Sequence, residues 1–316
     1  MQTGAAPAAP ASFGGAAAPT PANWASIVVL GLVWGGTFMV VSVALRGYGP
    51  ITVACARTTL GAAALLSLMA VLRRPWPARG VWPHLVVIGA LNTALPFTLL
   101  SWGQQYVPSA FAGIAMAALP LFVLPLAHVF TDEPMSPRRA VGVCVGFAGA
   151  LVLIGPGLRQ IGSGSEPLAQ LACLAASLSY AVSSILTRRC PPVDPIALAA
   201  ATLLVGSALL IPAMLLVEGV PRWMPGAPGW AILFLGLVPT AFAALLRVTT
   251  IRTAGAVFMT LVNYQVPLWS VIFGWAILSE ALPMRFFAAL ALILCGLAIS
   301  QWGSLRRLFA SASSSG

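Results

Sequence analysis

The stretch PLFVLPLAHVFTDE at residues 120–133 is followed 147 positions later by PLWSVIFGWAILSE at residues 267–280. Both stretches begin with a proline, run through apolar residues and end at a glutamate, so Pro120 matches Pro267 and Glu133 matches Glu280. The same shift aligns further residues without a gap: Gly89 with Gly236, Thr93 with Thr240, Arg138 with Arg285 and Gly149 with Gly296. The chain therefore contains two copies of one unit, and that unit is longer than a single helix.

The composition predicts that these copies lie in a lipid bilayer. Hydrophobic residues make up 59% of the 316 residues, charged residues make up 7%, and the mean hydropathy is +0.96. A soluble domain carries about 25% charged residues, and a helix needs about 20 apolar residues to cross a bilayer. The apolar stretches of that length span residues 24–45, 51–72, 81–103, 109–130, 138–155, 167–187, 195–217, 229–250, 256–278 and 284–303. We expect an all-α membrane bundle of ten transmembrane helices.

The distribution of arginines predicts the orientation of this bundle. Ten spans put both termini on one side of the membrane, and the loops on that side hold eleven of the sixteen arginines. The loops on the other side hold four, and Arg57 lies inside the second span. Because basic loops remain in the cytoplasm, we expect cytoplasmic termini and a bacterial inner-membrane location. The arginines are scattered singly or in pairs, so the net charge of +10 does not indicate nucleic-acid binding.

The two copies are expected to be inverted relative to each other. Each unit contains an odd number of spans, five, so the second copy starts on the opposite side of the membrane and crosses it in the opposite direction. Pro50 also matches Pro195, at a shift of 145. The expected organisation is a tail at 1–22, a first repeat at 23–156, a periplasmic linker at 157–166, a second repeat at 167–304 and a cytoplasmic tail at 305–316. Inverted repeats are typical of alternating-access transporters, whose site lies near the midplane.

Residues 24–303 resemble the EamA-type branch of the drug/metabolite transporter superfamily, and within it the YddG-like amino-acid exporters. The marks are Trp34-Gly35, Pro50 followed by Arg57, Pro120 followed by Glu133, and Pro267 followed by Glu280. The sequence departs from the family at Glu133-Pro134, where an arginine often follows the glutamate, and at Ser179-Tyr180, which replaces Trp34-Gly35 in the second copy. The resemblance implies ten helices, a central cavity and export of small metabolites, without fixing the substrate.

Prolines inside the spans predict where backbone carbonyls become available. A proline in a helix frees the carbonyl four residues earlier, and in lipid that carbonyl must find a partner in the protein or in cavity water. Pro96 frees the carbonyl of Asn92, and Pro267 frees that of Asn263. Each site combines a carbonyl and an amide, which can bind an ammonium or hydroxyl group; the alternative is a kinked helix whose asparagine bonds a neighbouring helix. We expect Pro120 to bend the fourth span as a hinge.

Polar aromatic and amide residues near mid-span complete the predicted substrate site. Indole N–H and phenol O–H groups at this depth need partners, whereas Trp302 near a span end is typical of an interfacial anchor. The predicted substrate-binding residues are Trp34, Asn92, Tyr180, Asn263, Tyr264 and Gln265.

Two kinds of charged residue remain to be assigned. An arginine deep in a membrane costs about 2.5–3.5 kcal/mol, so Arg57 should face protein or water. It is either a partner for a substrate carboxylate or, as we favour, a strut that bonds carbonyls or Glu280 between the halves. Glu133 with Arg138 and Glu280 with Arg285 are expected to form structural ion pairs at the loops.

The sequence predicts a secondary transporter that exports small neutral or zwitterionic metabolites, with neutral or aromatic amino acids favoured. A nucleotide-sugar carrier of the same superfamily is the alternative, although Arg57 alone is a poor match for phosphates. A membrane-embedded enzyme is less favoured because no mid-span carboxylate accompanies the isolated His84 and His128. No cofactor and no metal site is predicted, the partner is a small molecule, and the oligomeric state is left open with a monomer allowed.

The topology can be tested with single cysteines in an otherwise cysteine-free chain. A cysteine within 73–79 or 188–194 should react with an impermeant maleimide only from the cytoplasm. A cysteine within 157–166 or 220–226 should react only from the periplasm, because the arginine asymmetry sets the sidedness. Reaction of both sets from one side would contradict the ten spans and the inverted repeat together.

Overall fold

The computed structural model describes residues 19–131, 133–155 and 164–313, and these ranges contain helices and no strand. Ten helical segments are long and apolar enough to span a membrane, which confirms the predicted all-α bundle. The first repeat comprises α1 (Pro21–Ala44), α2 (Pro50–Val71), η1 (Arg79–Val81) with α3 (Trp82–Gly89), η2 (Ala90–Ala94) and α4 (Leu95–Gly103), then α5 (Ser109–Met116) with α6 (Leu119–Phe130), and α7 (Pro137–Ile154). The second comprises α8 (Ser165–Arg189), α9 (Pro195–Val217), α10 (Ala227–Gly236) with η4 (Leu237–Phe242) and α11 (Ala243–Ala254), then α12 (Ala256–Met259) with α13 (Val262–Ala276), and α14 (Met284–Ser313).

The ends of the predicted organisation fall partly outside the described residues. Residues 1–18, 156–163 and 314–316 of the predicted tails and linker are not among them. Within the described part, α1 starts at Pro21, so the last two residues of the expected N-terminal tail belong to the helix, and α14 continues to Ser313, into the segment expected to be a tail.

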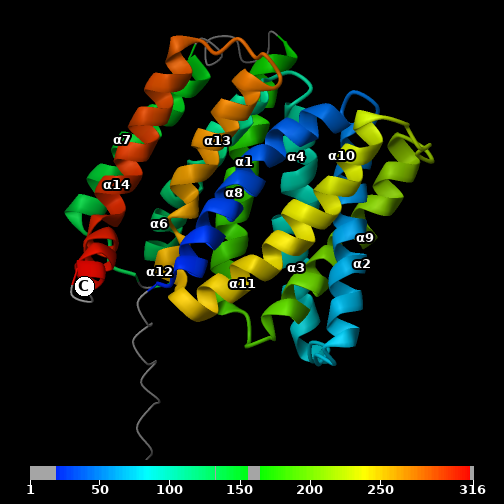
Figure 1. Cartoon of the computed structure of the whole chain (residues 1–316), viewed down its shortest axis with the longest axis horizontal. Helices are drawn as coiled ribbons and strands as arrows, with labels where there is room; N and C mark the ends of the chain where they lie inside the picture. The colour runs from blue at the N-terminus through cyan, green and yellow to red at the C-terminus, as the bar shows by residue number, and fades with distance from the viewer. Residues whose placement is uncertain (1–18, 132, 156–163, 314–316) are drawn as a thin grey trace, which may run out of the picture.

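The bundle has two faces, which we name by the chain ends. The terminal face is where α1 begins and α14 ends, at the bottom of Figure 1; the far face is opposite. The packing repeats between the two units: α1 packs along α13 as α8 packs along α6, while α2 faces its counterpart α9 and α7 faces its counterpart α14. These exchanged pairs are the arrangement that inverted repeats produce.

Prolines and polar caps define where the spans begin. Proline occupies the first turn of α1, α2, α7 and α9, where its missing N–H has no intrahelical partner to lose. Thr20 and Asn23 form a capping box before α1, and Ser136 caps α7.

α2 and α9 are held together at both faces. At the far face the Glu218 carboxylate accepts hydrogen bonds from the backbone N–H groups of Ile51 (2.9 Å) and Thr52 (2.8 Å). At the terminal face Asp194 caps its own helix, α9, and lies 3.5 Å from Arg74 Nη1 beyond the end of α2. A carboxylate at a helix N-terminus stabilises both the orphan N–H groups and the helix dipole.

Each repeat contains one π-helical turn at the same place near mid-depth. η2 and η4 follow Gly89 and Gly236, which match at the shift of 147. A π-turn widens the helix and leaves backbone groups out of the regular ladder, and such turns are frequent at functional sites. In a membrane these groups need partners from the protein or from cavity water.

A threonine from each π-turn packs against a glycine of the opposite repeat. Thr93 in η2 donates to the Gly89 carbonyl at 2.6 Å and lies directly against Gly206 of α9. Thr240 in η4 lies against Gly61 of α2, where an added Cβ would lie 2.6 Å from its Cγ2. Gly61 and Gly206 match at a shift of 145, so the two contacts are copies of one junction.

Substitution at one junction tests how tightly it is packed. Gly206→Ala places a methyl group on Thr93 and should destabilise the fold by about 1–3 kcal/mol, the usual range for overpacking. Thr93→Ala removes the obstructing hydroxyl, so the double variant should recover part of the loss. The measurement is the thermal unfolding midpoint in detergent. Gly303→Ala, where nothing lies within 4 Å of the added Cβ, is the control. Equal midpoints for Gly206→Ala and the control would contradict the junction.

Candidate functional site

The first contact at mid-depth joins α1 to η4. Trp34 lies near the middle of α1, and its indole N–H donates a 3.1 Å hydrogen bond to the carbonyl of Pro239. The half-buried Trp34 ring packs beside an apolar cluster to which α1, α11, α12 and α13 contribute. The indole donor that sequence reasoning left without a partner is therefore satisfied by a π-turn of the other repeat.

Arg57 binds the next residue of the same π-turn. Its Nε donates a 2.9 Å hydrogen bond to the hydroxyl of Thr240, and its guanidinium carbon lies 3.9 Å from the centroid of the Phe97 ring. The sequence suggested carbonyl groups or Glu280 as the partners of a strut; the structure gives Nε a hydroxyl. The Tyr180 ring on α8 lies 6.5 Å from that of Phe97. Arg57 is thus held between two repeats by a hydrogen bond and a cation–π contact.

The second π-turn reaches the same cluster from the other side. Ser179, the neighbour of Tyr180 on α8, donates a 2.7 Å hydrogen bond to the carbonyl of Leu91 in η2. Asn92, half-buried, follows Leu91 in that turn. The structure therefore brings four predicted site residues into one run across mid-depth, which also includes Phe97 and both π-turns: Trp34, Arg57, Tyr180 and Asn92.

The predicted α13 residues form a separate group. Asn263, Tyr264 and Gln265 are all half-buried near the start of α13. Gln265 lies against Gly31 of α1, where an added Cβ would be 2.7 Å from its Oε1. The Tyr264 hydroxyl is buried and has no hydrogen-bond partner among the described residues. No hydrogen bond in the described ranges links this group to Arg57, so the structure does not join the two sets.

The three prolines take different positions in their spans. Pro96 lies in the first turn of α4, directly after η2, and Pro120 lies in the first turn of α6, after the interruption at Ala117–Ala118. Pro267 lies inside α13, where it leaves the Asn263 carbonyl without its usual donor. Pro96 and Pro120 therefore lie where the helix geometry changes, whereas α13 continues through Pro267; the hinge and kink roles of the three prolines stay predictions.

The predicted ion pair of Glu133 has the wrong partner. The Glu133 carboxylate lies 2.6 Å from Arg188 Nη1 and 3.9 Å from Arg139 Nη1. Arg138 instead places its guanidinium over the Trp302 ring, 5.3 Å from the centroid. Arg138 lies in the first turn of α7, the helix that packs on α14, so its neighbour in space is α14 and not the glutamate five residues earlier.

Glu280 is also not paired with Arg285 as predicted. Its carboxylate accepts hydrogen bonds from the backbone N–H groups of Ser109 (2.7 Å) and Ala110 (3.1 Å), at the start of α5. Arg285 lies near Gly155 and the Phe286 ring. Backbone N–H groups at a helix start attract a carboxylate as an arginine does, but no sequence pattern identifies them.

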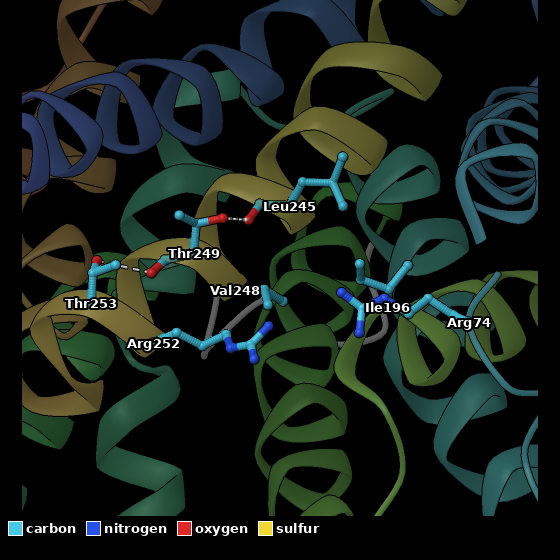
Figure 2. A pocket seen from close by; sticks show the side chains of 7 residues that line it. All are labelled: Arg74, Ile196, Leu245, Val248, Thr249, Arg252 and Thr253. Carbon is cyan, nitrogen blue, oxygen red and sulfur yellow. Dashed lines mark hydrogen bonds between the residues drawn. The ribbon is translucent and has the colours of Figure 1, made fainter. Parts of the chain in front are cut away.

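A pocket of about 350 Å³ lies away from this run, at the terminal face (Figure 2). It is lined by Arg74, Ile196, Leu245, Val248, Thr249, Arg252 and Thr253, none of which belongs to the predicted site. Figure 2 shows the hydroxyls of Thr249 and Thr253 bonded to carbonyls of their own helix, α11, so the arginines supply its free donors. Its distance from mid-depth separates it from the run around Arg57.

Sequence reasoning missed several residues of the mid-depth run. Phe97 and Pro239 carry no signal that separates them from other residues of apolar spans, and Ser179 is marked only by its match to Trp34. Thr93 and Thr240 do carry one, because they match between the repeats, but a match alone does not show what each threonine touches.

Ten spans, two inverted repeats and a polar, aromatic run at their interface define a membrane transporter. Comparison with known proteins agrees with this class. The model of the EamA-like transporter family matches residues 23–155 and 167–301, and the chain belongs to that family.

Several relatives match over almost their whole length. The chain is 25% identical to the uncharacterized transporter YoaV of Bacillus subtilis, over 89% of this chain and 97% of the relative. It is 24% identical to a probable terminal-alkyne amino-acid exporter of Streptantibioticus cattleyicolor, over 90% and 95%. It is 25% identical to the uncharacterized inner membrane transporter YedA of Escherichia coli K12, over 88% and 90%. A solved structure titled "Crystal structure of protein" shares the fold, with a TM-score of 0.63, 22% identity and coverage of 90% and 98%.

The Arg57–Thr240 contact can be measured by a double-mutant cycle. Arg57→Met and Thr240→Val should each lower the unfolding midpoint. The changes in the free energy of unfolding should be non-additive by about 1.5–3 kcal/mol, the range for hydrogen bonds to charged groups. Arg57→Lys should not restore the midpoint, because an ammonium has neither the Nε donor nor the planar face. Arg46→Met, at an exposed loop position, is the control. Additive effects would show that the contact carries no coupling.

Proposed function

We propose that the protein exports small neutral or zwitterionic metabolites, with neutral and aromatic amino acids as its substrates, by alternating access. The observation that carries the proposal is the run of Trp34, Arg57, Phe97 and Tyr180, held at mid-depth by the π-turns of both repeats. The probable amino-acid exporter among the relatives supports the substrate class.

The chemistry of the run suits the parts of an amino acid. Thr240 engages only Nε of Arg57, and a guanidinium has four further N–H donors that can bind a carboxylate. The amide group of Asn92, with the carbonyl group freed in its span, can accept from an ammonium in this run, and Asn263 offers the same chemistry in the separate α13 group. The rings of Phe97 and Tyr180 offer an apolar, aromatic surface for a side chain. Arg57 then serves as strut and carboxylate partner at once.

A nucleotide sugar is the competing substrate. Its diphosphate calls for more than one cation, and within the described mid-depth run only Arg57 supplies one. We therefore favour the zwitterion.

We further propose that the terminal face is cytoplasmic. The arginine distribution supports this orientation, and with it the periplasmic position of the linker at 157–166. The terminal-face pocket would then open toward the cytoplasm. The proposed repeat boundaries are 23–156 and 167–304.

Transport assays with purified protein test the function. In proteoliposomes, radiolabelled neutral and aromatic amino acids should exchange, whereas empty liposomes should not. Trp34→Ala, Asn263→Ala and Tyr264→Ala should each reduce the initial rate by about tenfold or more, the equivalent of one good contact of about 1.4 kcal/mol. Trp302→Ala should retain the rate, because Trp302 is half exposed near a span end. Equal losses in all four variants would refute the sorting by depth, and exchange of nucleotide sugars without amino acids would overturn the proposed substrate.

A further inference from the structure

One helix-end contact exists at the far face, and the described residues do not form its equivalent at the terminal face. At the far face Glu280, just beyond α13, binds the N–H groups of Ser109 and Ala110 at the start of α5. Ser270 of α13 adds a 3.2 Å hydrogen bond to the Ser109 carbonyl. Ser109 and Ala110 are fully buried by this contact. The far ends of α5 and α13, which belong to different repeats, are therefore fastened together.

The repeat predicts where the second copy of this contact belongs. The shift of 147 converts Glu280 into Glu133 and residues 109 and 110 into residues 256 and 257, the first residues of α12. In the structure Glu133 is bonded to Arg188 instead, and no side chain of the described residues caps α12. The terminal-face equivalent of the Glu280 contact is therefore not formed, and the Glu133 side chain remains 42% exposed.

The segment that would complete the copy is built to move. α12 has only four residues, whereas its counterpart α5 has eight. α12 follows Gly255 at φ +88, a conformation that suits glycine, while the matching position before α5 is Pro108, whose φ is fixed by its ring. A glycine at the start of α12 allows a reorientation that proline at the start of α5 restricts.

We infer that Glu133 and Glu280 are alternate latches of the transport cycle, an inference that rests on the proposed alternating access. In this structure the far-face latch is closed, because Glu280 binds the start of α5, and Glu133 forms an ion pair with Arg188. In the opposite state Glu133 leaves Arg188 and binds the backbone N–H groups of residues 256 and 257, while Glu280 releases α5. Inverted repeats exchange conformations between states, so each contact that closes one face has its copy at the other.

Arg188 makes the two states of the latch unequal in free energy, which the symmetry of the repeats alone would not do. At the shift of 145 the counterpart of Arg188 is Val43, so the far face has no arginine at the equivalent position to pair with Glu280. The Glu133–Arg188 pair therefore favours the state in which the terminal face is unlatched. Because both side chains are largely exposed, the bias is small enough for the cycle to reverse.

Spin-label distances in lipid nanodiscs, measured without substrate, test the latch independently of what is transported. One label pair, at Phe130 and Val257, reports the terminal face, and a second, at Tyr106 and Ile277, reports the far face; all four side chains are exposed. Arg188→Met should remove the shorter ion pair of Glu133, leave the 3.9 Å contact with Arg139, and raise the ratio of short to long distances at the terminal face by about two- to fivefold. Arg189→Met, the exposed neighbour, should change nothing. Glu280→Gln should lengthen the far-face distance.

The decisive variant is the double substitution Arg188→Met with Glu133→Gln. It should return the terminal-face distances toward those of the unaltered chain, because a neutral amide is a weaker ligand for helix-start N–H groups than a carboxylate. A terminal-face shift in Arg188→Met that persists in the double variant, or no shift at all in a chain that elutes as a single species, overturns the latch. Failure of amino-acid transport with the distance changes intact would instead reject the proposed substrate and leave the latch standing.

Discussion

The backbone groups released by the two π-turns at mid-depth must find partners in the protein or in cavity water, because lipid offers none. In both turns the partner comes from the opposite repeat. Trp34 of α1 donates to the Pro239 carbonyl in η4, and Ser179 of α8, the residue that matches Trp34 at a shift of 145, donates to the Leu91 carbonyl in η2. The threonine–glycine junctions add a second cross-repeat contact beside each turn. Separating the two repeats at mid-depth would require cavity water to replace these partners, which favours large motion at the helix ends.

The helix ends divide into a fixed and a changeable set. α2 and α9 are bound at both faces, by Glu218 at one and by Asp194 with Arg74 at the other. Gly49 at the start of α2 has no side chain to cap that helix, so Glu218 of the other repeat supplies the cap. α5 and α13 are bound to each other at the far face, and the hydrogen bonds of the described residues include no such contact at the terminal face. A pair fixed at both faces and a pair fixed at one face provide an axis and a moving part, as alternating access requires.

The sequence predicted the fold well because the signals for it are local or periodic. Span length and the Pro120–Glu133 repeat each follow from residues that can be counted along the chain, whereas the orientation drawn from the arginine asymmetry stays a prediction. The site was predicted only in part. Arg57, Trp34 and Tyr180 are conspicuous polar groups in apolar spans, but their partners are the Thr240 hydroxyl, a backbone carbonyl and the Phe97 ring, which composition does not reveal. The predicted partners of Glu133 and Glu280 were wrong for a related reason. Nearness in sequence favoured the arginines five residues later, whereas packing brought Arg188 next to Glu133 and the start of α5 next to Glu280.

The comparison of matched positions separates structural from functional demands. Positions that keep their residue in both repeats, such as Gly61 with Gly206 and Thr93 with Thr240, make the same packing contact twice, so the fold itself constrains them. Positions that differ lie where the two halves cannot be equivalent. Residue 57 is an arginine in one repeat and Thr202 in the other; Thr93 touches the Thr202 carbonyl where Thr240 accepts from the guanidinium. An asymmetric substrate needs its charge partner on one side of a symmetric interface, and a cycle with a preferred direction of opening needs a bias at one face. Under the proposed function Arg57 at this divergent position is the first of these, and under the inferred latch the unmatched Arg188 is the second.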